Sequence, residues 1–260
     1  MSFRFSVISQ VEKIERKFAV FSKLKDFTNS NVAVGEFSPV ITASQPKLLQ
    51  FFKLGWNVNN TEETQKQTFV RAEGVLNPDN SQLYKGAMGI IHHPKFKEAI
   101  QSRRCVIVAD ALLVWNRLNA YLVYPKNKNR PFVMAGIWNS FLDPISGRLK
   151  NSYAIITTVA NELFRDLGQD RAPLILNNFK LRVWMNSRHL SDVVHTMQPF
   201  DGSLFNAYPV DSGIENPINK SISFLQPIGP KLYEEKTNML SRLAAKTSKR
   251  SRGRGLKSNK

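Results

Sequence analysis

The segment RRCVIVADALLVWN, from Arg103 to Asn116, holds the first residues whose types and spacing would suit chemistry. Two arginines lead into an apolar run typical of a buried strand, the acid Asp110 follows, and a second apolar run ends in a tryptophan. A carboxylate between two such runs is either a satisfied piece of core or part of the wall of a site. The residue types alone leave both interpretations open.

Other candidate groups for catalysis or metal binding are few. His92 and His93 are neighbours, so they would point apart on a strand, and no obvious third ligand accompanies them. Asp166 and Asp170 flank the end of an expected helix, where cap or surface charges are more common than an acid–base pair. The sequence has no Gly-rich phosphate loop, Cys-x-x-Cys, His-Glu-x-x-His or Gly-x-Ser-x-Gly motif. We therefore expect no metal ion and no small-molecule cofactor.

The formal net charge of +17 is the strongest compositional signal. Seven positive charges lie in the last 15 residues, Lys246 to Lys260, which contain no acid, and this leaves about +10 on the rest of the chain. An excess of this size favours binding to a polyanion, most often a nucleic acid, through the release of condensed counterions. The alternatives are a basic protein that is merely soluble and one that touches an anionic membrane surface.

Cysteine content and apolar run length indicate the compartment. The single cysteine, Cys105, lies inside an apolar run, so a disulfide framework is excluded and a reducing compartment fits. No apolar stretch approaches the roughly 18 residues needed to span a bilayer. The N-terminal segment carries charges where a signal peptide needs an uninterrupted apolar core. We expect a soluble cytoplasmic protein that associates with the DNA of the nucleoid and not with a membrane.

Short apolar runs alternate with turn-rich joints along the chain. Apolar and β-branched residues predict strands at 32–43, 103–116, 119–125, 130–139 and 152–160. Helices are predicted at 94–101, 160–168 and 189–197, the first beginning with proline and the second ending at glycine. Strands outnumber helices and follow one another directly. This order predicts an α+β fold with a mainly antiparallel, barrel-like sheet core and peripheral helices.

Residues 1–235 show no convincing internal boundary, so we expect a single domain there. A short helix is predicted at 236–245, because acids lead into it and Arg242 comes late, as the helix dipole favours. Residues 246–260 are rich in Ser, Gly, Lys and Arg, which predicts a disordered basic tail. The tail is either a nucleic-acid-binding arm or a solubilising extension.

Seven segments, in chain order, resemble the motifs of the SOS-response-associated peptidase (SRAP) family, the abasic-site shielding proteins. They read MSFRFS, SNVAVGEFSPVI, FVRAEG, RRCVIVADALLVWN, PFVMAGIWN, IITTVAN and QDRAPLIL. The family typically reads MCGRYS, YNIAPTQ, NARAET, RRCLIPADGFYEW, PFAFAGLWE, ILTTEAN and HDRMPVIL in the same order. The resemblance runs from Met1 to about Leu176, with a weaker echo at 208–217. Each motif alone is weak, whereas all seven in register are specific.

The resemblance implies a covalent chemistry on damaged DNA. In this family the initiator methionine is removed, and the amine and thiol of the exposed cysteine attack the ring-opened aldehyde of an abasic site. The product is a thiazolidine that crosslinks protein to DNA. A glutamate and a histidine act in this chemistry, an asparagine near the N-terminus orients the site, and arginines hold the phosphates of single-stranded DNA.

This chain departs from the family at the three reactive positions. The nucleophile position is Ser2, the glutamate position is Val114 and the histidine position is Gln169. A serine hydroxyl is not ionised near neutral pH, valine moves no proton, and glutamine forms hydrogen bonds without titrating. Adducts formed by the Ser2 amine hydrolyse readily, so we expect covalent trapping to be lost.

Residues that suit binding persist, and we take them as candidate DNA contacts: Arg4, Asn31, Trp56, Arg71, Glu73 and Arg171. Arginine binds phosphate in a bidentate manner, and tryptophan stacks on bases. The structural alternatives are an ion pair of Arg71 with Glu73 or of Arg171 with Asp170, and a place in the core for Trp56. Other family positions differ as well, since Phe69 replaces an asparagine, and Val34 and Gly35 replace a Pro-Thr pair.

Three functions stay open, and with them the question of whether the chain is an enzyme. The first is a SRAP pseudoenzyme that binds single-stranded or abasic-site DNA without crosslinking it. The second is an active variant in which Ser2 or its amine engages abasic sites. The third is an interaction protein that kept the fold and lost the DNA site. Retention of Met1 would exclude the second, and absent or salt-insensitive DNA binding would exclude the first.

Overall fold

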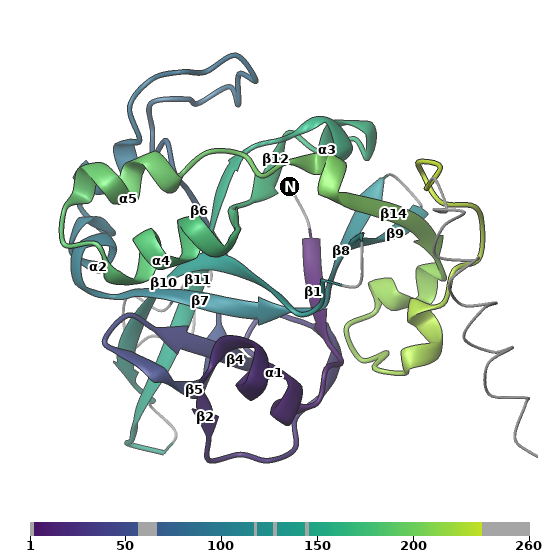
Figure 1. Ribbon diagram of the computed structural model, residues 1–260, viewed down its shortest axis with the longest axis horizontal. Coiled ribbons are helices and arrows are strands. Elements are labelled where there is room, and N and C mark those ends of the chain that lie inside the picture. The colour runs from purple at the N-terminus through teal and green to yellow at the C-terminus, as the bar shows by residue number, and fades with distance from the viewer. Residues whose placement is uncertain (1–2, 57–66, 117–118, 127–128, 144–145, 236–260) are drawn as a thin grey trace, which may run out of the picture.

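Asp110 divides the segment from Arg103 to Asn116 between two sheets (Figure 1). Strand β7 (Arg104–Ala109) belongs to a nine-stranded sheet and β8 (Ala111–Asn116) to a five-stranded one, so the prediction of a single strand is wrong. The computed structural model describes residues 3–56, 67–116, 119–126, 129–143 and 146–235. Ser2, the helix predicted at 236–245 and the tail predicted at 246–260 lie outside the described residues.

The Asp110 carboxylate is a satisfied structural group. It is 1% exposed and accepts hydrogen bonds from the backbone N–H groups of Ile8, at 2.8 Å, and Ser9, at 2.7 Å. The Ser9 hydroxyl donates a third, at 2.6 Å, and the backbone N–H of Asp110 donates to the carbonyl of Ser6. A buried carboxylate with three donors is stable where it lies, so this acid ties the end of β1 to the passage between the sheets.

The nine-stranded sheet closes into a barrel. Its ring consists of β4 (Phe37–Thr42), β5 (Gln45–Leu54), β7, β10 (Phe132–Leu142) and β11 (Leu149–Val159). Strand directions cannot alternate fully around a ring of five, so one neighbouring pair must be parallel, and this pair is β5 with β11. The strands at its edges are β2 (Phe21–Ser22), β6 (Phe69–Arg71), β12 (Arg171–Pro173) and β13 (Ile175–Leu176). The expected α+β fold with a mainly antiparallel, barrel-like core is confirmed.

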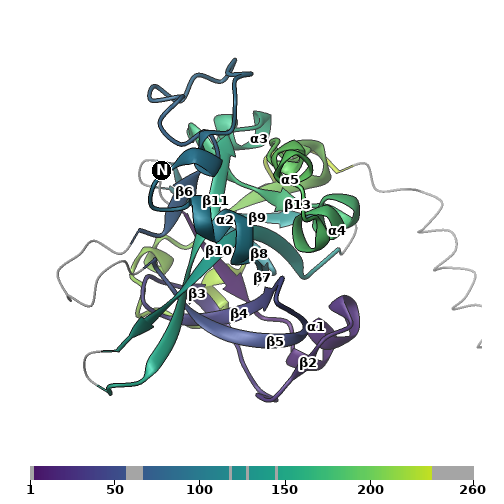
Figure 2. The same cartoon turned by 90° about the vertical axis from the view of Figure 1, so that its left-hand side faces the viewer.

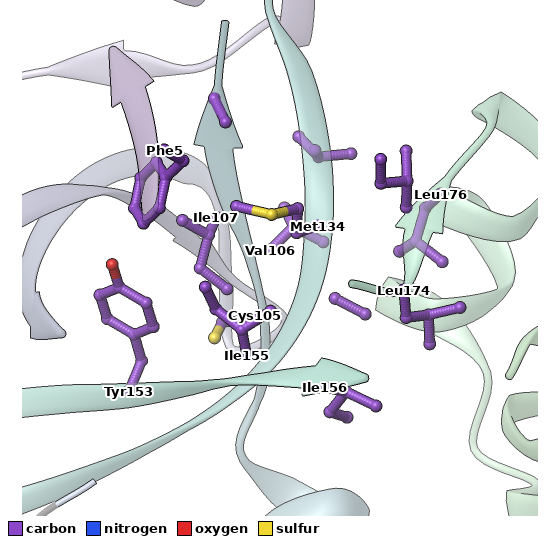
Figure 3. Close-up of a cluster of buried hydrophobic side chains, with 14 of the residues drawn as sticks. Phe5, Cys105, Val106, Ile107, Met134, Tyr153, Ile155, Ile156, Leu174 and Leu176 are labelled. Carbon is purple, nitrogen blue, oxygen red and sulfur yellow. The ribbon is translucent and has the colours of Figure 1, made fainter. Parts of the chain in front are cut away.

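Apolar side chains from the ring strands fill the barrel (Figure 3). Ile107, Met134 and Ile155 are fully buried there. Tyr153 is also fully buried, and its hydroxyl shares a hydrogen bond of 2.6 Å with the Ser38 hydroxyl, so no phenol oxygen is left without a partner. The barrel is therefore a packed core and not a channel.

The second sheet lies beside the barrel and is antiparallel throughout. Its order is β14 (Phe205–Val210), β9 (Asn119–Pro125), β8, β1 (Phe3–Val7) and β3 (Asn29–Val32). Side chains alternate across β1, so Phe3 and Phe5 face the main core whereas Arg4 faces away from it. Phe3 pairs with Val114 on β8, which brings the start of the chain to the segment discussed first.

Five short α-helices lie at the periphery of the described structure: α1 (Val11–Phe18), α2 (Lys97–Ser102), α3 (Glu162–Asp166), α4 (Asn178–Asn186) and α5 (Leu190–Thr196). Single 3₁₀ turns cover Gly89–His92, Gly202–Leu204, Ser212–Glu215 and Ile222–Leu225. The three predicted helices are present with shorter bounds, whereas α1 and α4 were not predicted. Helices α4 and α5 pack together, and α2 and α4 contact β7 (Figure 2). None of the described helices is long and apolar enough to cross a membrane.

Arg104, at the start of β7, satisfies the ends of two helices. The residue is 6% exposed, and its guanidinium donates to the carbonyls of Ile100 and Gln101, both at 2.9 Å, at the end of α2. It also donates to Trp184, at 2.7 Å, and to Ser187, at 2.6 Å, at the end of α4. Helix ends leave carbonyls without partners, so this arginine stabilises the packing of both helices on the barrel.

Replacing Asp110 with alanine leaves the N–H groups of Ile8 and Ser9 buried without an acceptor. We expect the free energy of unfolding, measured by urea denaturation, to fall by about 3 kcal/mol. Alanine at the exposed Asp26 is the matched control, with an expected change within about 0.5 kcal/mol. Equal losses in the two variants would contradict the structural role of Asp110.

Candidate functional site

A buried ion pair joins Arg171, at the start of β12, to Glu73, just after β6. Arg171 Nη2 lies 2.6 Å from Glu73 Oε2, and the two side chains are 5% and 2% exposed. Arg171 also donates to Thr157 on β11, to the hydroxyl at 3.1 Å and to the carbonyl at 2.8 Å. Glu73 Oε1 accepts from the Val159 N–H at 3.3 Å. Burial lowers the pKa of Arg171, and the Glu73 carboxylate partly offsets this, so each charge depends on the other.

Asn80 connects this ion pair to Arg71. Its side-chain oxygen accepts from Arg171 Nη1 at 3.1 Å and from Arg71 Nη2 at 2.5 Å. Asn80 has a φ of 54°, in the left-handed region, which asparagine tolerates better than most residues. Arg71 Nη2 also donates to the Pro78 carbonyl, at 3.1 Å. In the part of the chain that the structure describes, Arg71 donates only through Nη2, so Nε and Nη1 remain for an external anion.

Arg71, Asn80 and Arg171 line one side of a pocket of about 530 Å³. This volume falls within the range of about 300–1,000 Å³ typical of small-molecule sites. The lining combines aromatic rings, the guanidinium groups of Arg71 and Arg171, the carboxylate of Asp170 and neutral polar groups. Its residues are Gln67, Phe69, Val70, Arg71, Gly74, Val75, Pro78, Asn80, His93, Phe96, Thr157, Asp170 and Arg171.

An apolar cluster of Phe3, Phe69 and Val114 adjoins this pocket. The rings of Phe3 and Phe69 lie 4.4 Å apart with an angle of 39° between their planes, and Phe3 pairs with Val114 across β1 and β8. Phe3 is 5% exposed and Val114 is fully buried. Gln169 reaches the same place, because its side-chain amide donates to the Trp115 carbonyl at 2.7 Å. The structure therefore gathers Val114 and Gln169, while Ser2 lies outside the described residues.

Arg4 and Asn31 lie together on the other face of β1. Arg4 Nη1 donates to Asn31 Oδ1 and to the Ile214 carbonyl, both at 3.3 Å, and its guanidinium stacks over the Trp115 ring at 5.1 Å. Asn31 is fully buried and donates to the same Ile214 carbonyl at 2.8 Å. Burial lowers the pKa of Arg4, and two nearby carboxylates partly offset this. The pair holds the segment around residue 214 against β1, and its role in DNA binding stays a prediction.

The sequence left the roles of Trp56 and the two histidines undecided, and the structure shows where each side chain lies. Trp56 is 3% exposed and packs edge-on against Phe96 at 5.5 Å, so its ring is part of the core and offers no open face to a base. His93 stacks on the same Phe96 ring at 4.7 Å and lines the pocket, whereas His92 is exposed. Among the described residues, no three His, Cys, Asp or Glu side chains come close enough to hold a metal ion.

The profile of the family described as SOS response associated peptidase (SRAP) matches residues 1–217. The chain belongs to the SRAP family. Two curated relatives are similar to it: abasic site processing protein YoqW of Bacillus subtilis (strain 168), 32% identical over 140 residues, and YoaM of the same strain, 30% identical over 142. These matches cover 51% and 52% of this chain and 61% and 62% of the relatives, so the chain spans about three fifths of the length of the curated relatives it matches.

Solved structures share the SRAP fold seen here. A protein from Bacteroides thetaiotaomicron superposes with a TM-score of 0.72 at 23% identity, covering 88% of this chain and 100% of that one. A protein from Bordetella bronchiseptica gives a TM-score of 0.64 at 17% identity, covering 81% and 100%. These likenesses establish a common fold.

The site contains contacts that the sequence did not reveal. Neither ion pair considered from the sequence forms, because Glu73 pairs with Arg171 and leaves both Arg71 and Asp170 out of the pair. Asn80, which bridges the two arginines, lies in a turn and carries no sequence signal. The apolar cluster did carry a sequence signal. In the segments that resemble SRAP motifs, Phe3 stands where the family has glycine, and Phe69 stands where it has asparagine.

Replacing Arg171 with methionine leaves the Glu73 carboxylate buried without its partner. We expect the free energy of unfolding to fall by about 3–5 kcal/mol in urea denaturation. The double variant Arg171→Met/Glu73→Leu removes both charges and should regain much of that loss. A double variant that is as unstable as Arg171→Met alone would show that the pair is not coupled.

Proposed function

We propose that this protein binds single-stranded DNA, with or without an abasic site, at the pocket beside Arg71 and forms no covalent bond with it. The observation that carries the proposal is the contrast within one site. The guanidinium of Arg71 is oriented and has free donors, whereas the family's glutamate position nearby holds Val114 and the ring of Phe69 lines the same pocket. A binding surface is kept beside a catalytic centre that has none of its reactive groups.

Charge supports a nucleic acid as the partner. The chain has a formal net charge of +17, and Nε and Nη1 of Arg71 keep N–H donors that can form charge-assisted hydrogen bonds to phosphate. The relatives YoqW and YoaM are named for abasic site processing, which agrees with DNA as the polyanion. The predicted tail would add sequence-independent affinity, because its seven positive charges release further counterions. We also infer a cytoplasmic location in contact with the nucleoid.

The loss of covalent chemistry rests on the groups near the pocket. Val114 has no proton to give or take, and Gln169 uses its amide on the Trp115 carbonyl. Glu73 is the nearest carboxylate in the network, but Arg171 and the Val159 N–H occupy its two oxygens. A general base must lie within hydrogen-bond reach of the substrate, whereas Glu73 is 2% exposed and held in its ion pair with Arg171. This arrangement favours binding over an active variant that relies on Ser2 alone.

Arg71→Ala tests the proposal through fluorescence anisotropy with a labelled single strand. We expect an affinity about tenfold lower than that of the unaltered protein, because a charge-assisted contact to phosphate is lost. The slope of log K against log salt should fall by about 1.

Arg148→Ala is the matched control for this measurement. Arg148 is exposed and immediately precedes β11. Thr157, which lines the pocket, lies near the other end of this strand, about 30 Å away. Its replacement should leave affinity within about twofold. Binding that is absent, or that does not weaken with salt, would contradict the proposal and favour an interaction protein that kept only the fold.

A further inference from the structure

The pocket beside Arg71 is lined by aromatic rings as well as by charge. Phe69 is half-buried and lines it, with Phe3 packed against its ring. The half-buried His93 also lines the pocket, and its ring lies 4.7 Å from that of Phe96, which is buried beneath it. Rings of this kind stack on nucleobases regardless of sequence. They gain nothing from a sugar that has lost its base.

Strand β6 sets the spacing between the aromatic and the cationic contact. Phe69 and Arg71 are two residues apart and both half-buried, whereas Val70 between them is 2% exposed, so both point to the pocket side. Two residues along a strand span about 7 Å. A base stacked on Phe69 therefore has a backbone phosphate within reach of the free donors of Arg71.

The polar lining suits the edge of a base and not a second phosphate. Gln67 and Asn80 carry amides, and the exposed Asp170 carries a carboxylate. A carboxylate repels phosphate, but it accepts hydrogen bonds from the amino groups of bases. Mixed donors and acceptors around aromatic rings are the features of sites that take a planar heterocycle.

From these features we propose that the pocket takes an intact nucleobase of single-stranded DNA, stacked on Phe69 with its phosphate on Arg71, and disfavours a base-free sugar. The inference rests on the proposed function and adds its specificity. Phe69 determines this preference for a base, because its ring stands where the SRAP motif has a small polar side chain, asparagine. The aromatic ring at this position supplies a stacking surface.

The test compares two strands of equal charge by fluorescence anisotropy, using the full chain at one salt concentration. One is an oligothymidylate of about ten nucleotides, and the other is the same length of tetrahydrofuran units, which have the backbone without bases. We expect the oligothymidylate to bind about tenfold more tightly. In Phe69→Leu, which keeps the apolar bulk, this ratio should fall to within about twofold while binding of the base-free strand is unchanged.

Two further variants separate this inference from the proposed function. Arg71→Ala should weaken binding of both strands and preserve their ratio, because both contain phosphates. Phe179→Leu, at a ring that is 74% exposed on α4, is the control and should change neither affinity. Equal binding of the two strands, or a ratio that persists in Phe69→Leu, overturns the inference alone. Failure of both strands to bind at low salt overturns the proposed function with it.

Discussion

The buried ion pair between Arg171 and Glu73 is the interaction on which the site depends. The pair and its hydrogen bonds join three elements: β12, the turn after β6, and β11. Arg171 Nη1 also donates to the side-chain oxygen of Asn80, which accepts a further hydrogen bond from Arg71. A buried charge without its partner strongly destabilises the fold, whereas the paired charges stabilise each other. A substitution at either position alone therefore causes a large loss of stability. The pair therefore preserves the cationic wall of the pocket for a structural reason, whether or not any chemistry takes place beside it.

The two halves of the site have diverged in different ways. The cationic half depends on long-range contacts with the barrel, whereas one of the reactive positions of the SRAP motifs, Val114, lies in an apolar cluster. Phe3, Phe69 and Val114 form one contiguous cluster, so their substitutions are consistent with one another as packing. A reactive cavity must hold polar groups that have no hydrogen-bond partner in the protein, and this destabilises the fold. An apolar cluster avoids this destabilisation, but it cannot carry out the chemistry.

The sequence was most informative where local pattern determines structure. The run 119–125 is predicted and observed as a strand with the same bounds, because it is a short apolar run bounded by turn residues. The division at Asp110 was not predicted, since neither glycine nor proline marks it and only the donors of Ile8 and Ser9 explain it. Helix α1 was missed although Val11 and Ile14 have helical spacing and are buried. The partner of Glu73 lies 98 residues away in the sequence, and contacts of that range leave no local pattern.

The most direct test of this account is a comparison of native and denaturing gels of the full-length protein mixed with a single strand that carries one abasic site. An intact strand of the same sequence is run alongside. The account predicts a shift of both strands on the native gel and no retained species on the denaturing gel, because neither Val114 nor Gln169 can move a proton. A band that survives denaturation with the abasic strand alone would contradict it and would show that covalent chemistry persists despite Ser2, Val114 and Gln169.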